Sequence, residues 1–109
     1  MDMVQGTLDV LVLRGLTWGP KHGYAVARWI EQSSGGTLTV LDGALYTALH
    51  RMEDRGLIAA EWGVSDNNRR ARFYKLTRAG RKQVEKESQR WEKATAILSR
   101  FVAPDEEPV

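Results

Sequence analysis

The sequence predicts an α+β domain that is mainly α-helical, and three observations support this prediction. Three segments of the first half repeat apolar residues at helical spacing. Two short extended segments joined by a polar turn follow, as in a β-hairpin. A long helix is then expected from Arg78 to about Val102. With 109 residues and an apolar fraction of 42%, the chain suits one domain with a small core.

The first two helices are defined by apolar spacing and by the turns that end them. The first is expected over about residues 7–17, buried on more than one side by Leu8, Leu11, Val12 and Leu16. Residues 18–20 (Trp-Gly-Pro) end it, since proline cannot continue a helix. The second is expected over about residues 23–33, with Tyr24, Ala27 and Ile30 on one side. A turn at residues 33–36 and an extended segment at residues 37–40 follow.

The third helix is the most informative segment of the chain. It is expected over residues 42–55, where Asp42 can cap the first turn by accepting backbone N–H groups. Gly56 can end it in the left-handed conformation, with Leu57 folding back onto Met52 in a Schellman motif. One face is predicted to be buried through Leu45, Ala48, Leu49 and Met52. The other face carries polar groups and rings, from Tyr46, Thr47, His50 and Arg51.

A hairpin and the long helix complete the chain. Strands are expected at residues 57–63, with Ile58, Ala60 and Trp62 on one face, and at residues 71–76. Asn67 and Asn68 can close the turn between them because asparagine tolerates positive φ. Thr77 is expected to cap the long helix. The chain thus divides into a domain over residues 1–77, a helix over residues 78–102 and a disordered acidic tail over residues 103–109.

Three helices followed by a two-stranded wing form the order of the winged helix-turn-helix fold. A helix fits the major groove of duplex DNA, and a basic hairpin beside it can reach phosphates or the minor groove. Residues 51–82 carry nine basic and four acidic side chains, a net charge of +5 that is typical of polyanion binding. Double-stranded DNA is therefore the predicted partner, contacted by Tyr46, Thr47, His50, Arg51, Asn68, Arg69, Arg70 and Arg72. Two alternatives stay open: a solvated charged surface, and a winged-helix module that binds acidic proteins without specific DNA binding.

Composition and spacing argue against most other chemistry. Without cysteine, the chain has no disulfide, thiol nucleophile or thiolate metal ligand. His22 and His50 lie far apart in the sequence, so we expect no metal and no other cofactor, and His22 is interpreted as a helix cap or a surface residue. No nucleophile–base set or phosphate-binding glycine loop is present, so we expect no enzyme activity, and Glu53 is expected to pair with arginines of the wing. No segment is typical of a membrane span or signal peptide, which predicts a cytoplasmic protein.

Motifs along most of the chain resemble the PadR family of bacterial transcriptional regulators. The resemblance runs from Gly6 to about Trp91 and rests on GTLD (6–9), GPKHGY (19–24), GALYTALHRME (43–53), GLI (56–58), WG (62–63) and RRARFYKLT (69–77). A single C-terminal helix is typical of the compact branch of the family. The resemblance implies a homodimeric repressor of an inverted-repeat operator, often responsive to a small aromatic or drug-like ligand. Thr47 replaces a frequent proline, and Asn67 and Asn68 replace frequent wing glycines, which puts the operator preference in doubt.

The long helix carries a heptad seam that predicts a homodimer. Its members are Val84, Ser88, Trp91, Thr95, Leu98 and Val102, widened by Ala94, Ile97 and Phe101. The alternative is an amphipathic helix docked on its own domain. The resemblance implies that this helix packs against the first helix of the partner subunit, where Leu8 and Leu11 lie.

Trp91 is the candidate ligand residue. In multidrug-binding relatives, a tryptophan at the matching place stacks on a flat aromatic ligand, and Ser88, one turn earlier, would line the same cavity. The alternative is an interface tryptophan without a ligand. Trp18, Trp29 and Trp62 are predicted to be packing residues.

Overall fold

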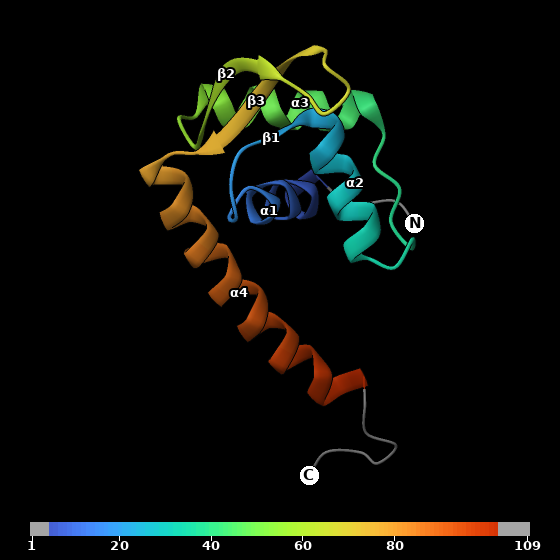
Figure 1. The fold of residues 1–109 in the computed structure, drawn as a ribbon. Helices are drawn as coiled ribbons and strands as arrows, with labels where there is room; N and C mark the ends of the chain where they lie inside the picture. The colour runs from blue at the N-terminus through green and yellow to red at the C-terminus, as the bar shows by residue number, and fades with distance from the viewer. Residues whose placement is uncertain (1–4, 103–109) are drawn as a thin grey trace.

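Four helices and a small antiparallel sheet make up residues 5–102, the part of the chain that the computed structural model describes (Figure 1). In chain order they are α1 (Gln5–Gly15), β1 (Lys21–His22), α2 (Gly23–Ser33), α3 (Asp42–Asp54), β2 (Ile58–Val64), β3 (Arg70–Leu76) and α4 (Arg78–Val102). The mainly helical winged helix-turn-helix fold with a long last helix is therefore confirmed. The predicted tail at residues 103–109 lies outside the described residues.

The core surrounds α1, which contacts α2, α3 and α4 (Figure 1). It is formed by one stripe from each of the first three helices and by the base of the sheet: Leu8, Val12, Leu13, Leu16, Val26, Ala27, Ile30, Val40, Leu45, Ala48, Leu49, Met52, Leu57, Ile58, Tyr74 and Leu76. The predicted buried face of α3 is thereby confirmed. Of the three residues predicted to share one side of α2, Ala27 and Ile30 are buried, whereas Tyr24 is exposed.

The sheet has three strands within the described residues, in the order β1-β3-β2, where the sequence predicted two. The wing is the β2–β3 hairpin, with a register that runs from Ile58 opposite Leu76 to Val64 opposite Arg70. The missed strand, β1, pairs Lys21 with Tyr74 and His22 with Phe73. Two polar residues are too few to show the alternation that predicts a strand. Only their pairing with β3 defines β1.

Both ends of α3 were predicted, and one of the two predictions is wrong. The N-cap is Leu41 and not Asp42, which is the first helical residue and makes no capping hydrogen bond. Its carboxylate still lies in the first turn, where the helix dipole favours a negative charge. The Schellman end is confirmed: Gly56 has φ 74°, its N–H donates to the Glu53 carbonyl at 2.9 Å, and the Leu57 N–H donates to the Met52 carbonyl at 2.9 Å.

The start of α4 is fixed by Thr77, as predicted. The Thr77 hydroxyl accepts the Gly80 N–H at 3.1 Å and donates to the Gly56 carbonyl at 2.6 Å, so one side chain links the end of α3 to the start of α4. Gly80 is required at this crossing because a Cβ there would lie 2.0 Å from the Leu57 carbonyl oxygen. The helix is therefore seated closely against the chain between α3 and β2.

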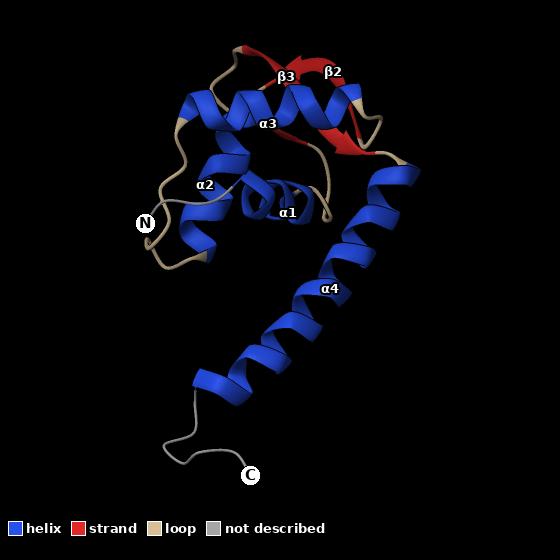
Figure 2. Cartoon of the chain, turned by 180° about the vertical axis from the view of Figure 1, so that it is seen from behind, coloured by secondary structure: helices blue, strands red, loops and turns tan. Residues whose placement is uncertain are grey.

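Only the first half of α4 packs on the rest of the domain. Val84 contacts the core, whereas the C-terminal half extends away from the other elements (Figure 2). That half exposes a row of large apolar side chains: Trp91, Ile97, Leu98, Phe101 and Val102. The helix therefore carries an apolar surface that no other element among residues 5–102 covers.

Candidate nucleic-acid interface

One open groove of about 1040 Å³ brings together the start of α2, the outer face of α3 and the wing. Aromatic or imidazole side chains that line it include His22, Tyr24, Trp29, Tyr46 and Trp62, and its arginines are Arg28, Arg69, Arg70 and Arg72. His50 and Tyr74 also line it. The groove thus combines positive charge with flat rings.

The outer face of α3 presents Tyr46, Thr47 and His50 to solvent, as predicted from its spacing. Tyr46 lies against the first residue of α2, since a Cβ at Gly23 would lie 3.3 Å from the tyrosine hydroxyl. The absence of a side chain at Gly23 therefore lets α2 and α3 approach closely at the mouth of the groove. Hydroxyl and imidazole groups on an exposed helix can donate to and accept from the edges of bases.

Arg51 does not join that face. Its Nη2 donates to the Asp9 carboxylate of α1, and its Nε is buried without a hydrogen-bond partner among the described residues. Asp9 lies 42 positions earlier, so no local pattern could have shown this ion pair. The side chain predicted to read DNA therefore links α3 to α1.

The wing is joined to α3 by a second ion pair, as predicted for Glu53. Arg72 Nη2 donates to the Glu53 carboxylate at 2.7 Å. The same guanidinium lies over the Tyr74 ring at 5.8 Å. Burial raises the pKa of the Tyr74 hydroxyl, and the charge of Arg72 offsets part of that rise. The base of the wing is therefore fixed against α3.

The tip of the wing closes with Asn68 at φ 59°, as its tolerance of positive φ predicted. The Asn68 N–H donates to the Ser65 carbonyl and the Ser65 N–H to the Arg69 carbonyl, both at 2.8 Å, which gives a three-residue hairpin loop. Asn68, Arg69 and Arg70 are all exposed there. The tip thus presents one amide and two guanidinium groups beside α3.

Sequence reasoning missed several residues that line the groove, among them Tyr24, Arg28 and Trp62. Trp62 was predicted to pack, as was Trp18, but their exposed fractions are 61% and 65%. Burial declines along β2 from Ile58 through Ala60 to Trp62, because the distal hairpin extends beyond the core. Trp29 does pack against the core, as predicted.

The start of α2 is held by a side chain that the sequence did suggest. His22 Nδ1 accepts the Ala25 N–H at 3.2 Å and so caps α2, and its ring lies edge-on to Phe73 of the wing at 5.3 Å. Tyr24 and Arg28, one turn apart on α2, then project along the same side of the groove, where the Arg28 guanidinium donates to the Tyr24 hydroxyl at 3.4 Å. A capping histidine two residues before a tyrosine was the available signal.

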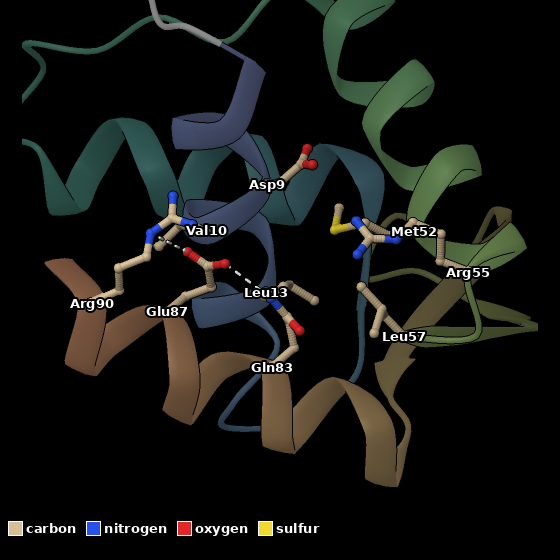
Figure 3. A pocket seen from close by; sticks show the side chains of 9 residues that line it. All are labelled: Asp9, Val10, Leu13, Met52, Arg55, Leu57, Gln83, Glu87 and Arg90. Carbon is tan, nitrogen blue, oxygen red and sulfur yellow. Dashed lines mark hydrogen bonds and ion pairs between the residues drawn. The ribbon is translucent and has the colours of Figure 1, made fainter.

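A smaller cavity of about 190 Å³ lies between α1, the end of α3 and α4 (Figure 3). Its rim carries Asp9, Arg55, Gln83, Glu87 and Arg90. Glu87 is held by its own helix, because Gln83 donates to it at 2.9 Å and Arg90 lies 3.7 Å from it. Asp9 therefore belongs both to this rim and to the ion pair with the recognition helix.

Two further features bear on the class of protein. Within residues 5–102, no three His, Asp or Glu side chains gather in a way that could hold a metal ion. None of the helices in that range is long and apolar enough to cross a membrane.

Comparison with known proteins points to one family. A sequence profile described as the Transcriptional regulator PadR-like family matches residues 12–86. A 37.1 kDa protein of transposon TN4556 from Streptomyces fradiae is 37% identical over 98 residues; the match covers 90% of this chain but 27% of that protein. A solved transcriptional regulator from Clostridium thermocellum is 26% identical with a TM-score of 0.81, covering 90% of this chain and 92% of that one. A solved PadR family transcription regulator from Clostridium difficile R20291 is 26% identical with a TM-score of 0.78, covering 90% and 100%.

Proposed function

The chain belongs to the PadR-like family of transcriptional regulators, which are DNA-binding proteins and not enzymes, and from this premise we propose that it is a homodimeric repressor of an inverted-repeat operator. The observation that supports this proposal most directly is the groove, where an exposed polar helix face lies beside a basic wing. The major groove is about 12 Å wide, which matches a helix with its side chains. A DNA partner also implies a location in the bacterial cytoplasm, where the chromosome lies.

In this proposal, α3 supplies the base contacts and the wing supplies phosphate or minor-groove contacts. Tyr46, Thr47 and His50 are the candidate base readers. Asn68, Arg69 and Arg70 are the candidate wing contacts, and Arg72 adds positive charge while it pairs with Glu53. Arg51 is proposed to position α3 and not to contact DNA, because its guanidinium already binds Asp9.

The proposed dimer uses the exposed half of α4. Trp91, Leu98 and Val102 are exposed on that helix, and the cost of leaving such side chains in water favours a second copy as their partner. Val84 already packs on its own core, and Leu8 is only 6% exposed, so neither is available as a main contact. Leu11 is partly buried and can still be reached by a partner helix. Residues 1–77 would then bind DNA, and residues 78–102 would dimerise.

A ligand-binding role for Trp91 is the finer part of the proposal. Its ring is exposed on α4 within the proposed seam, and Ser88 lies one turn away on the same helix. In a symmetric dimer, each subunit would contribute one indole to a shared cavity. A planar aromatic molecule between two indoles would then prefer one spacing of the two wings and release DNA.

The function is tested by binding to DNA. Fluorescence anisotropy would compare a labelled duplex from the region upstream of the protein's own gene with a random duplex of equal length, at several salt concentrations. A repressor prefers the upstream duplex. For each tenfold increase in salt concentration, the logarithm of its affinity falls by about 0.9 per phosphate contacted. Arg70→Ala should weaken both duplexes about equally, whereas Tyr46→Ala should change the preference between them. Absence of duplex binding would favour the protein-interaction module instead.

The ligand is tested on the same samples. Planar aromatic compounds are titrated into wild type and Trp91→Ala while tryptophan fluorescence and DNA affinity are recorded. Quenching that requires Trp91 and lowers DNA affinity supports ligand-gated release. DNA binding without quenching would make Trp91 an interface residue only.

A further inference from the structure

We propose that Arg28 of α2 and Arg70 of the wing contact DNA phosphates beside α3, and that Tyr24 and Trp62 are the rings that position them. This inference rests on the proposed function, since it assigns the phosphate contacts of the same groove. Arg28 and Arg70 are called the groove arginines below. Tyr24 and Trp62 are positioning residues, because they act through the arginines.

The groove arginines are selected from four arginines that lie over aromatic rings in the described residues. Arg14 lies over Trp18 at 5.0 Å, but neither residue lines the groove. Arg72 lies over Tyr74, but its guanidinium is paired with Glu53. Arg28 and Arg70 line the groove and form no ion pair with another residue in the described range. Only these two combine a supporting ring, a place in the groove and donors left for a ligand.

The wing pair follows from the register of the hairpin. Trp62 is opposite Arg72, and Arg70 is two residues away on β3, so Trp62 and Arg70 are diagonal neighbours on one face of the sheet. The Arg70 guanidinium lies 4.5 Å from the centre of the indole ring. This face turns toward the groove, because Trp62, Arg70, Arg72 and Tyr74 all line it. The exposed indole of Trp62 therefore supports the Arg70 guanidinium and does not pack in the core.

The α2 pair follows from helical spacing. Tyr24 and Arg28 are four residues apart, and the guanidinium lies 5.7 Å from the ring centre while donating to the hydroxyl. Both residues are exposed and line the same groove as the wing pair. Tyr46 and His50, on the outer face of α3, line that groove too. A helix in a major groove is flanked by phosphate backbones, so arginines beside its exposed face suit phosphate contacts.

Stacking on a ring suits a phosphate contact. A ring covers one flat side of the guanidinium and leaves the N–H donors at its edge, where a phosphate binds in bidentate fashion. An exposed arginine otherwise has much rotational freedom to lose on binding. A ring that holds the guanidinium in place before DNA arrives reduces that loss. Acidic groups of a protein could use the same donors, but two arginines in one groove with the exposed polar face of a helix favour a duplex.

The test measures duplex affinity in variants that keep every charge. Trp62→Leu removes the ring below Arg70, and Trp62→Phe keeps a ring there. Trp18→Leu is the matched control, since it removes an equally exposed indole that also lies below an arginine but outside the groove. Anisotropy with the upstream duplex gives the affinity, and circular dichroism with thermal unfolding checks that each variant is folded.

The expected result is a loss of affinity in Trp62→Leu of about twofold to fivefold per half-site. A dimer on two half-sites should therefore lose about fourfold to twenty-five-fold, while Trp62→Phe recovers most of it and Trp18→Leu binds like wild type. In an Arg70→Ala background, Trp62→Leu should have little further effect, because the ring acts through that arginine. Tyr24→Leu and Arg28→Ala should show the same dependence on the α2 side.

Three results would overturn the inference. One is wild-type affinity in Trp62→Leu, and another is an equal loss from Trp62→Leu with and without Arg70. The third is binding of poly-glutamate with no binding of any duplex by the wild-type protein, which overturns the proposed function as well. Duplex binding by the wild type therefore separates failure of the proposed function from failure of this inference.

Discussion

Replacement of Arg51 by alanine separates a structural role from a DNA-reading role. The side chains of Arg51 and Asp9 are 26% and 19% exposed, so their ion pair lies between a surface pair and a buried one. A surface pair contributes about 0–1 kcal/mol, whereas removal of one partner of a buried pair costs about 3–5 kcal/mol. We expect Arg51→Ala to lower the free energy of unfolding by about 2 kcal/mol, in line with hydrogen bonds to charged groups.

The assay is urea unfolding followed by circular dichroism, applied to a double-mutant cycle. The free energies of unfolding of Arg51→Ala, Asp9→Ala and the double variant are compared with that of wild type. The sum of the losses in the two single variants should exceed the loss in the double variant by about 1–2 kcal/mol. His50→Ala is the control, because it removes an exposed side chain of the same helix and should change stability by less than about 0.5 kcal/mol. The remaining stability keeps the variant folded, since domains of this kind have about 5–15 kcal/mol.

The DNA measurement decides between the two roles. If Arg51 positions α3, Arg51→Ala and Asp9→Ala lower the affinity for the upstream duplex to a similar extent, because both release the same helix. The reasoning is refuted if Arg51→Ala unfolds at the wild-type urea concentration while it alters which duplex is preferred. In that case the guanidinium leaves Asp9 to contact a base.

Three further predictions follow from packing, titration and the exposed helix. Gly80→Ala should lower the free energy of unfolding by about 1–3 kcal/mol in thermal unfolding, because its Cβ would meet the Leu57 carbonyl. Gly43→Ala, whose Cβ would meet nothing within 4 Å, should raise it by up to about 1 kcal/mol. A change of the same sign in both variants would contradict the close crossing. Because the pKa of Tyr74 is raised in the folded protein, its neutral hydroxyl contributes stability that is fully present below about pH 10 and is lost as the pH rises through the folded-state pKa. Tyr74→Phe should therefore flatten the loss of melting temperature at alkaline pH, and an unchanged slope would contradict this prediction. Leu98→Lys, at a residue 59% exposed, should leave folding intact but give a monomer by sedimentation velocity, and a persistent dimer would contradict the α4 interface.

The parts of the fold that the sequence predicted are those set by local signals. The Schellman end at Gly56, the cap at Thr77 and the turn at Asn68 each involve groups within a few residues, so spacing alone could indicate them. The predicted position of the α3 cap was wrong by one residue, because Asp42 already belongs to the first turn and Leu41 is the extended residue before it. Strand β1 could not be predicted, because its pairing residues on β3 are distant in the sequence.

The candidate site divides along the same line. The outer face of α3 and the wing arginines were predicted because helical and strand periodicity place them. Periodicity also placed Trp62 on the same face as Ile58, yet it cannot tell how far the core extends beneath a strand. The contribution of α2 was missed because Tyr24 was grouped with Ala27 and Ile30, which are buried. Contacts that depend on three-dimensional packing were therefore the ones that sequence reasoning misplaced.

We expect Arg51 also to relate the proposed dimer to DNA binding. Two ion pairs hold α3, Asp9–Arg51 to α1 and Arg72–Glu53 to the wing, so the recognition helix is fixed on both sides. Helix α1 in turn contacts α4, and Asp9 lies on the rim of the cavity between them (Figure 3). In the proposed dimer, the partner subunit sets the position of α4. A change in that position would be transmitted through α1 to α3. Arg51→Ala should therefore weaken the dependence of DNA affinity on any compound that binds at Trp91, and equal ligand response in wild type and variant would show that the signal travels by another path.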